Sequence, residues 1–263
     1  MIQLIKVVNI LYELLQKYVK HKISSKMPSS LYQSFREQLV QNLEPAVCQH
    51  LFRVYACMTL ACAAAAAGSI VHLVGLWSAG LLSWLLQLAT CVALFQIPPS
   101  GDNRALRLGL LLATGALTGH LLGLTVEYAL VVDPGIVVTG LAGTTVSFAC
   151  LSLSALLARR GSFLLLGAVL SNMMALLLVM VLGNLFLQSW FVHKISLYLA
   201  MAAMLGFVLL DTQLIVEDFR QGNEDYVVHS LKLFFCAVDI FRLLVSILIG
   251  KRSNSGTRTE HRD

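Results

Sequence analysis

Two carboxylates lie inside apolar segments in the last quarter of the sequence. Asp211 follows the run FVLL, Asp239 lies within CAVDIF, and a short acidic loop separates the two segments. A charged side chain at the centre of a membrane helix costs about 2.5–3.5 kcal/mol on insertion scales, so such a residue usually faces a partner or a water-filled cavity. The chemistry open to these two groups is proton exchange and, when they are ionised, coordination of a hard cation such as calcium.

The segment around Asp239 carries further polar residues at helical spacing. His229, Lys232, Cys236 and Asp239 recur at steps of three and four, so they share one face of a helix, and Arg242 lies one turn beyond Asp239. We expect this stripe to face the centre of a bundle, where His229, Lys232 and Arg242 become candidates for lining a pore. The alternative is that Asp239 and Arg242 form an i,i+3 ion pair that makes the helix tolerable in lipid.

Asp211 needs another explanation, because no cation lies within four residues of it in its own segment. Counted from the loop, Asp211 lies about eight residues deep and Asp239 about twelve, which corresponds to roughly 12 and 18 Å. Cys236, about nine residues deep, is the better match in level. A direct contact between the two carboxyls therefore requires a tilt or a change of register.

The composition identifies an integral membrane protein. Of the 263 residues, 57% are hydrophobic and only 13% are charged, about half the charged share of soluble domains. The net charge of +5 does not indicate nucleic-acid binding, because the basic residues lie in the ends and short loops. Six scattered cysteines without a CxxC pair are interpreted as reduced packing residues, and no cofactor is expected.

Seven apolar segments with short connections predict an all-α bundle of seven membrane helices. We place one membrane domain at 31–250, a polar basic tail at 251–263, and a basic amphipathic extension at 1–30. The start of this extension either lies on an anionic membrane surface or packs as a soluble helix or loose tail. The run ACAAAAAG in the first segment favours close helix approach. The segments lie at 52–74, 76–97, 107–126, 136–158, 162–184, 195–217 and 227–250.

The distribution of Lys and Arg places the N-terminus in the cytosol, since the opposite loops then hold only Lys194. The tail KRSNSGTRTEHRD conflicts with this orientation, because seven spans would put its basic residues outside. Either the rule fails for the tail or one segment does not cross fully. If one segment falls short, the last is the first candidate, since Lys232, Asp239 and Arg242 interrupt it. We favour seven membrane helices and leave the side of the tail open.

Long, ordered motifs throughout the chain resemble the transmembrane Bax inhibitor motif family, in its endoplasmic-reticulum branch. The likeness covers about residues 40–250. The motifs are QHLFRVYA, the AAAAG run, LTG at 117–119, LSALLARRGSFLLLG, GFVLLDTQLIVE, the loop sequence QGNEDYVVH, LKLFF, and the FR that follows Asp239.

This resemblance implies a bundle with the last helix at its centre, residence in the endoplasmic reticulum membrane, suppression of cell death and a pH-sensitive calcium leak. The implied partners are membrane lipid, calcium as the transported ion, and apoptosis regulators of the Bcl-2 family. In the family, two aspartates on the sixth and seventh helices share a proton and gate the leak. Asp211 matches the first of them, but Cys236 stands at the position of the second, and whether Asp239 replaces it stays open.

Two carboxyls a few ångströms apart cannot both ionise easily, so they titrate as a coupled pair. With Cys236 in the second position, we expect weaker or shifted pH gating. The alternative function is a non-conducting membrane adaptor that binds and regulates apoptosis or stress-response proteins.

Other functional classes receive little support from the residues. An intramembrane hydrolase lacks its nucleophile motifs, and the third segment has no carboxylate to serve as counter-ion for a light-sensing Schiff base at Lys232. His120 is expected to be a hydrogen-bonded interior residue. His72, His120 and His193 are expected to lie too far apart for a metal site, so Asp211 is the one candidate for a transient calcium ligand.

Overall fold

The computed structural model describes residues 44–158 and 164–260, and the predictions for residues 1–43 lie outside these ranges. The described residues contain seven helices and no strand. The helices are α3 (Pro45–Leu73), α4 (Leu81–Gln96), α5 (Arg104–Val132), α6 (Gly135–Leu157), α7 (Leu164–Leu187), α8 (Trp190–Arg220) and α9 (Tyr226–Glu260). They correspond one to one to the predicted segments, which confirms the all-α fold.

Prolines and glycines account for several helix ends. Pro45 opens α3, a position where its missing N–H leaves no bond unmade. Gly75 has φ +75°, so the chain turns there and α4 begins at Leu81 instead of residue 76. Gly222, with φ +91°, makes the corresponding turn between α8 and α9. At the other end of the last segment, α9 continues to Glu260, through most of the predicted C-terminal tail.

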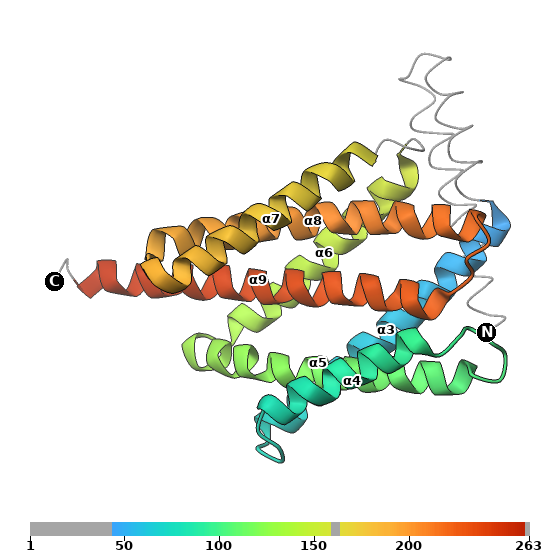
Figure 1. The fold of residues 1–263 in the computed structure, drawn as a ribbon. Helices are drawn as coiled ribbons and strands as arrows, with labels where there is room; N and C mark the ends of the chain where they lie inside the picture. Colours follow the sequence, from blue (N-terminus) through green and yellow to red (C-terminus); the bar gives the residue numbers. More distant parts are fainter. Residues whose placement is uncertain (1–43, 159–163, 261–263) are drawn as a thin grey trace, which may run out of the picture. The chain divides into compact units, whose positions relative to one another are not determined.

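The last helix occupies the centre of the bundle, as predicted. α9 packs against α3, α5, α6 and α8, whereas α4 packs mainly on α5, and α7 mainly on α8 (Figure 1). The core around α9 contains Leu233, Phe234 and Ile240, none of which is accessible to solvent. Every other helix is therefore positioned by contacts to α9 or to one of its neighbours.

Close packing of α3 on α5 depends on small residues, which confirms the role predicted for the alanine-rich run. A Cβ atom added at Gly119 would overlap the backbone of Ala65, and one added at Gly68 would overlap the backbone of Ala116. Such direct backbone contact is typical of small-residue interfaces between membrane helices.

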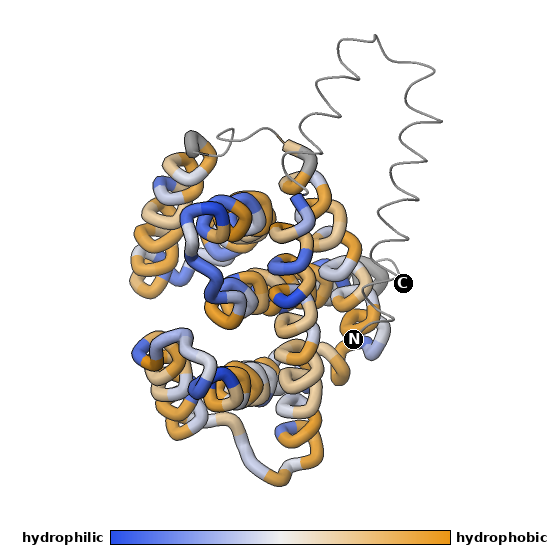
Figure 2. The backbone as a smooth tube through the Cα atoms, turned by 90° about the vertical axis from the view of Figure 1, so that its right-hand side faces the viewer, coloured by the Kyte–Doolittle hydropathy of each residue, from blue (hydrophilic) through white to orange (hydrophobic). Residues whose placement is uncertain are grey.

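Six of the seven helices in the described part of the chain are long and apolar enough to cross a membrane. The exception is α4, whose 16 residues measure about 24 Å against a hydrocarbon core of about 30 Å. Seven membrane helices were predicted, with the last segment as the first candidate to fall short, but the short helix is α4 and the last span, from Tyr226 to Arg252, is 27 residues long. Figure 2 shows the helices as predominantly hydrophobic, with hydrophilic residues in the connections at the end that faces the viewer.

Candidate functional site

Asp211 on α8 meets Cys236 on α9. The thiol donates a hydrogen bond to Oδ2 of the carboxylate, with 3.3 Å between sulfur and oxygen. Cys236 is buried, and Asp211 is half-buried. The prediction that Cys236 matches Asp211 in level is therefore confirmed. This single hydrogen bond is weak, since a thiol is a weaker donor than a hydroxyl or an amide.

Asp239 pairs with Arg242 and not with Asp211. The guanidinium nitrogen Nη2 lies 3.0 Å from Oδ1 of Asp239, in the i,i+3 arrangement of a helical ion pair. No hydrogen bond joins Asp211 to Asp239 in the described ranges. The alternative considered for Asp239, an ion pair within its own helix, is thus what the structure contains. Among the described residues, the carboxylate of Asp239 is therefore engaged by Arg242 and makes no contact with Asp211.

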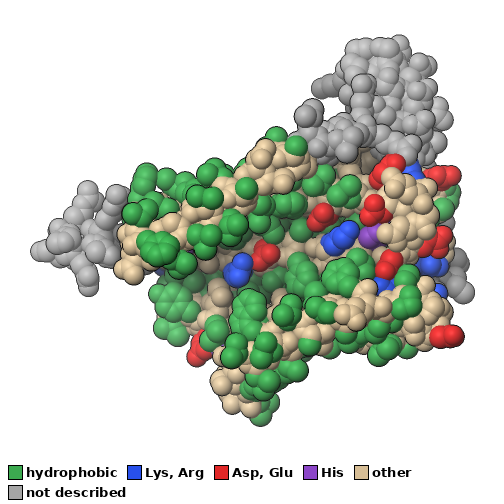
Figure 3. Space-filling view, viewed as in Figure 1, with side chains coloured by type: hydrophobic (Ala, Val, Ile, Leu, Met, Phe, Trp, Pro, Cys, Tyr) green, Lys and Arg blue, Asp and Glu red, His purple; other side chains and the backbone are tan. Residues whose placement is uncertain are grey.

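The polar stripe of α9 does not face inward as a whole. His229 and Cys236 are buried, whereas Lys232 and Arg242 are exposed. At about 100° per residue, Arg242 lies about 140° around the helix from His229, so the stripe is too wide for a single environment. Figure 3 shows charged side chains along α9, between the hydrophobic surfaces of α7 and α8 on one side and α4 on the other.

His229, a predicted pore-lining residue, takes part in a cluster that joins three helices. Its Nδ1 lies 3.0 Å from Nε2 of His50 on α3, and its Nε2 lies 3.5 Å from Oδ2 of Asp218 on α8. The ring of His50 also stacks on Phe219, with centroids 4.5 Å apart. His229 is 1% exposed, so it serves as a buried polar connection. The prediction that it lines a pore beside Lys232 and Arg242 is not supported by this placement.

A buried ion pair at the start of α9 was also absent from the sequence-based candidates. Nη1 and Nη2 of Arg107 on α5 donate to the two carboxylate oxygens of Asp225, at 2.9 and 2.5 Å. The side chains are 4% and 13% exposed. Two parallel charge-assisted hydrogen bonds form the strongest type of side-chain contact. The ion pair fixes the connection between α8 and α9 against α5.

His120 at the other end of the bundle is interior, as expected, but neither of its ring nitrogens has a hydrogen-bond partner among the described residues. It contacts the ring of Trp77 at 4.8 Å and that of His72 at 5.5 Å, measured between centroids. The expectation that His72 and His120 lie far apart was therefore wrong, because close packing of α3 on α5 brings them together. No group of three metal-ligating residues was found in the described ranges.

Comparison with known proteins identifies the family of the chain. The family model of "Inhibitor of apoptosis-promoting Bax1" matches residues 47–254. The chain is 45% identical to Bax inhibitor 1 of Mus musculus over 208 residues, which cover 79% of this chain and 88% of the mouse protein. It is 37% identical to Bax inhibitor 1 of Drosophila melanogaster over 220 residues (84% and 90%) and 35% identical to that of Arabidopsis thaliana over 220 residues (83% and 86%). With a family model matched over most of its length, a bundle of apolar helices and a central last helix, the chain belongs to the Bax inhibitor family of membrane proteins.

Proposed function

We propose that this protein suppresses cell death from the endoplasmic reticulum membrane through a pH-sensitive calcium leak that lowers store calcium, with Asp211 at the gate. Membership of a family described as inhibitors of apoptosis-promoting Bax1 supports the role in cell death. The six span-length helices of the described residues support a multi-pass membrane protein, and in the proposal ions cross between these helices. The N-terminus lies in the cytosol in this proposal, an orientation that a glycosylation tag at either end would test.

The contact between Asp211 and Cys236 is the main observation that supports the proposed leak. An ionised carboxylate has about four lone-pair positions, and one thiol hydrogen bond leaves most of them for water, a proton or a cation. Calcium prefers such oxygen ligands. Because the two residues lie on different helices, a change in the charge of Asp211 changes the attraction between α8 and α9 at that level.

The identity of the partner determines how steeply the leak depends on pH. Two facing carboxyls share protons and titrate together, so their combined response is strong. In this protein one carboxyl faces a thiol, and the second carboxyl of α9, Asp239, is paired with Arg242. We therefore expect a shallow pH dependence that corresponds to one protonating group.

Calcium efflux from liposomes that contain only the purified protein tests the proposal. The wild type should release calcium, and Asp211→Asn, which keeps the side-chain shape but cannot ionise, should alter the release and remove its pH dependence. Asp239→Asn is the matched control, because it neutralises a carboxylate of α9 whose partner is Arg242. Absence of efflux from the wild type at every pH would reject the leak.

The second candidate function is a non-conducting adaptor that binds apoptosis or stress-response regulators, such as proteins of the Bcl-2 family. It is favoured by the exposed Lys232, because a cation on the surface of α9 repels calcium and can pair with an acidic group of a partner protein. An adaptor would protect cells from death with Asp211→Asn as well as with the wild type. A conducting protein would lose protection and efflux together. No catalysed reaction is part of either proposal.

A further inference from the structure

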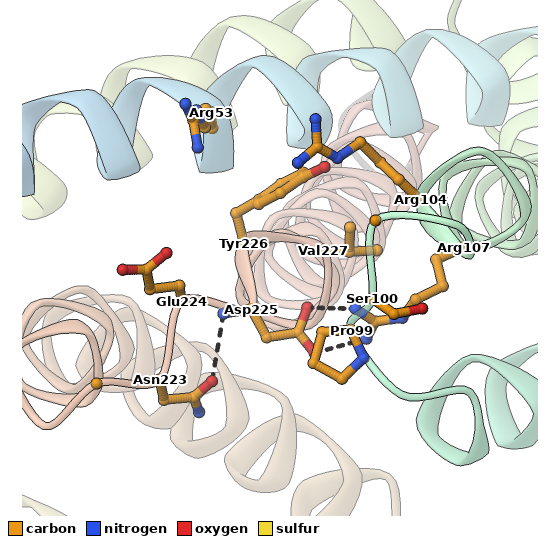
Figure 4. Close-up of a pocket in the computed structure, with 12 residues that line it drawn as sticks. Arg53, Pro99, Ser100, Arg104, Arg107, Asn223, Glu224, Asp225, Tyr226 and Val227 are labelled. Atoms are coloured by element: carbon orange, nitrogen blue, oxygen red, sulfur yellow. Dashed lines mark hydrogen bonds and ion pairs between the residues drawn. The ribbon is translucent and has the colours of Figure 1, made fainter.

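A pocket of about 360 Å³ lies where the α4–α5 connection meets the start of α9 (Figure 4). Its wall combines residues that are far apart in the sequence. Arg53 comes from α3, Arg104 and Arg107 from the first turns of α5, and Asp225 and Tyr226 from the end of the α8–α9 connection and the start of α9. The volume falls within the range of about 300–1,000 Å³ typical of small-ligand sites.

Some of the charged side chains in this wall are paired with each other and others are not. Asp225 is engaged by both terminal nitrogens of Arg107, which leaves Nε of Arg107 buried and without an acceptor in the described part of the chain. Arg53 and Arg104 have no ion-pair partner there either. The remaining acid, Glu224, lies across the pocket from Arg104 and Arg107 in Figure 4. The free charge of the pocket is therefore positive.

The backbone at the start of α5 adds to this preference for anions. The N-terminus of a helix carries N–H groups without intrahelical acceptors and a partial positive charge. The side chain of Asn103 does not cap α5, since its amide donates to the carbonyl of Pro98 at 3.4 Å, and the first turn of α5 contains no acidic residue. The start of α9 differs, because Asp225 already accepts a hydrogen bond from the backbone N–H of Val228 at 3.3 Å.

We propose that this pocket binds a phosphate monoester, held by Arg53, Arg104 and the first turn of α5. A phosphate monoester offers three oxygens to donors, and guanidinium groups bind such oxygens in pairs. The side chain of Tyr226 reaches toward Arg104 in Figure 4 and offers a hydroxyl to the same group. The pocket lies at the ends of the membrane helices, so a lipid headgroup and a soluble phosphate both have access to it. Binding at this site does not depend on whether the protein conducts calcium.

Two probes that share the phosphate monoester distinguish these sources. Glycerol 3-phosphate is the soluble probe, measured by calorimetry on the full chain in nanodiscs of phosphatidylcholine. Phosphatidic acid is the lipid probe, measured by competition with a fluorescent analogue, and phosphatidylserine controls for negative charge alone. Saturable binding of glycerol 3-phosphate assigns the site to a soluble ligand. Selective binding of phosphatidic acid over phosphatidylserine, without glycerol 3-phosphate binding, assigns it to a lipid, and either result supports the proposal.

Arg53→Gln and Arg104→Gln should each weaken binding about tenfold, since each removes a hydrogen bond to a charged group. Both side chains are exposed and outside the ion pair of Arg107, so the fold should persist; unchanged thermal midpoints check this. Arg252→Gln is the charge-matched control, because Arg252 pairs with Asp133 elsewhere; it should change binding less than about twofold. No binding of either probe, or an equal loss in Arg252→Gln, would overturn the proposal.

Discussion

Two of the polar contacts that hold α9 against its neighbours differ in strength. At the start of α9, Asp225 and Arg107 form two charge-assisted hydrogen bonds in a nearly buried site. Deeper along α9, Cys236 gives Asp211 one hydrogen bond from a thiol. The first contact satisfies two opposite charges, whereas the second leaves a carboxylate with most of its hydrogen-bonding capacity unused.

This contrast indicates which part of α9 is fixed and which part can change its contacts. A buried ion pair is costly to break, so the connection between α8 and α9 serves as an anchor. A carboxylate that faces a thiol changes its charge without leaving an opposite charge unpaired. The start of α9 therefore holds the bundle together, and the level of Asp211 is where a proton or a cation can alter the contact between α8 and α9.

The largest expected effect comes from the anchor. Arg107→Met should lower the free energy of unfolding by about 3–5 kcal/mol, because it leaves the charge of Asp225 unpaired in a nearly buried site. Denaturant titration in detergent micelles measures this loss. Arg252→Gln, which opens a half-exposed pair with Asp133, should have a far smaller effect. An equal loss of unfolding free energy in the two variants would contradict this prediction, because the buried pair would then stabilise the fold no more than the exposed pair.

An intermediate effect is expected for the histidine cluster beside the anchor. His229→Phe keeps a ring of similar size but leaves Nε2 of the buried His50 without the nitrogen that lies 3.0 Å away. The free energy of unfolding should fall by about 1–3 kcal/mol, the range for an unsatisfied buried polar group. The same titration measures it. His193→Phe, at an exposed position of α8, is the control, and a comparable loss there would contradict the assignment.

The smallest effect is expected for Asp239→Asn. Its ion pair with Arg242 is half-exposed, so its loss should change the free energy of unfolding by less than about 1 kcal/mol. The pH dependence of calcium efflux should also stay that of the wild type. A large change in that dependence would make Asp239 part of the gate and would remove the contrast between the two contacts.

The matching depth of Asp211 and Cys236 could be predicted from the sequence, because it depends only on counting residues from the loop. The two helices are antiparallel and joined by a short connection, so equal distances from the loop place residues at equal depths. The central position of α9 came from the family resemblance.

Counting residues from a loop could not reveal the ion pair of Arg107 with Asp225 or the contact of His50 with His229. Arg107 and Asp225 are 118 positions apart, and His50 and His229 are 179 apart. Periodicity identifies the face of a helix but not the neighbour that the face meets. Likewise His72 and His120 meet because glycines bring α3 and α5 into backbone contact, which separation along the chain conceals.

The most direct test of a leak gated at Asp211 compares the pH dependence of calcium efflux from liposomes for the wild type and Cys236→Asp. The wild type should show a shallow dependence that disappears in Asp211→Asn. Cys236→Asp places a second carboxyl at the position of the thiol, whose sulfur lies 3.3 Å from Oδ2 of Asp211, so the dependence should become steeper as the two groups titrate together. Identical pH dependence in the wild type, Cys236→Asp and Asp211→Asn would contradict the account, because the gate would then lie elsewhere.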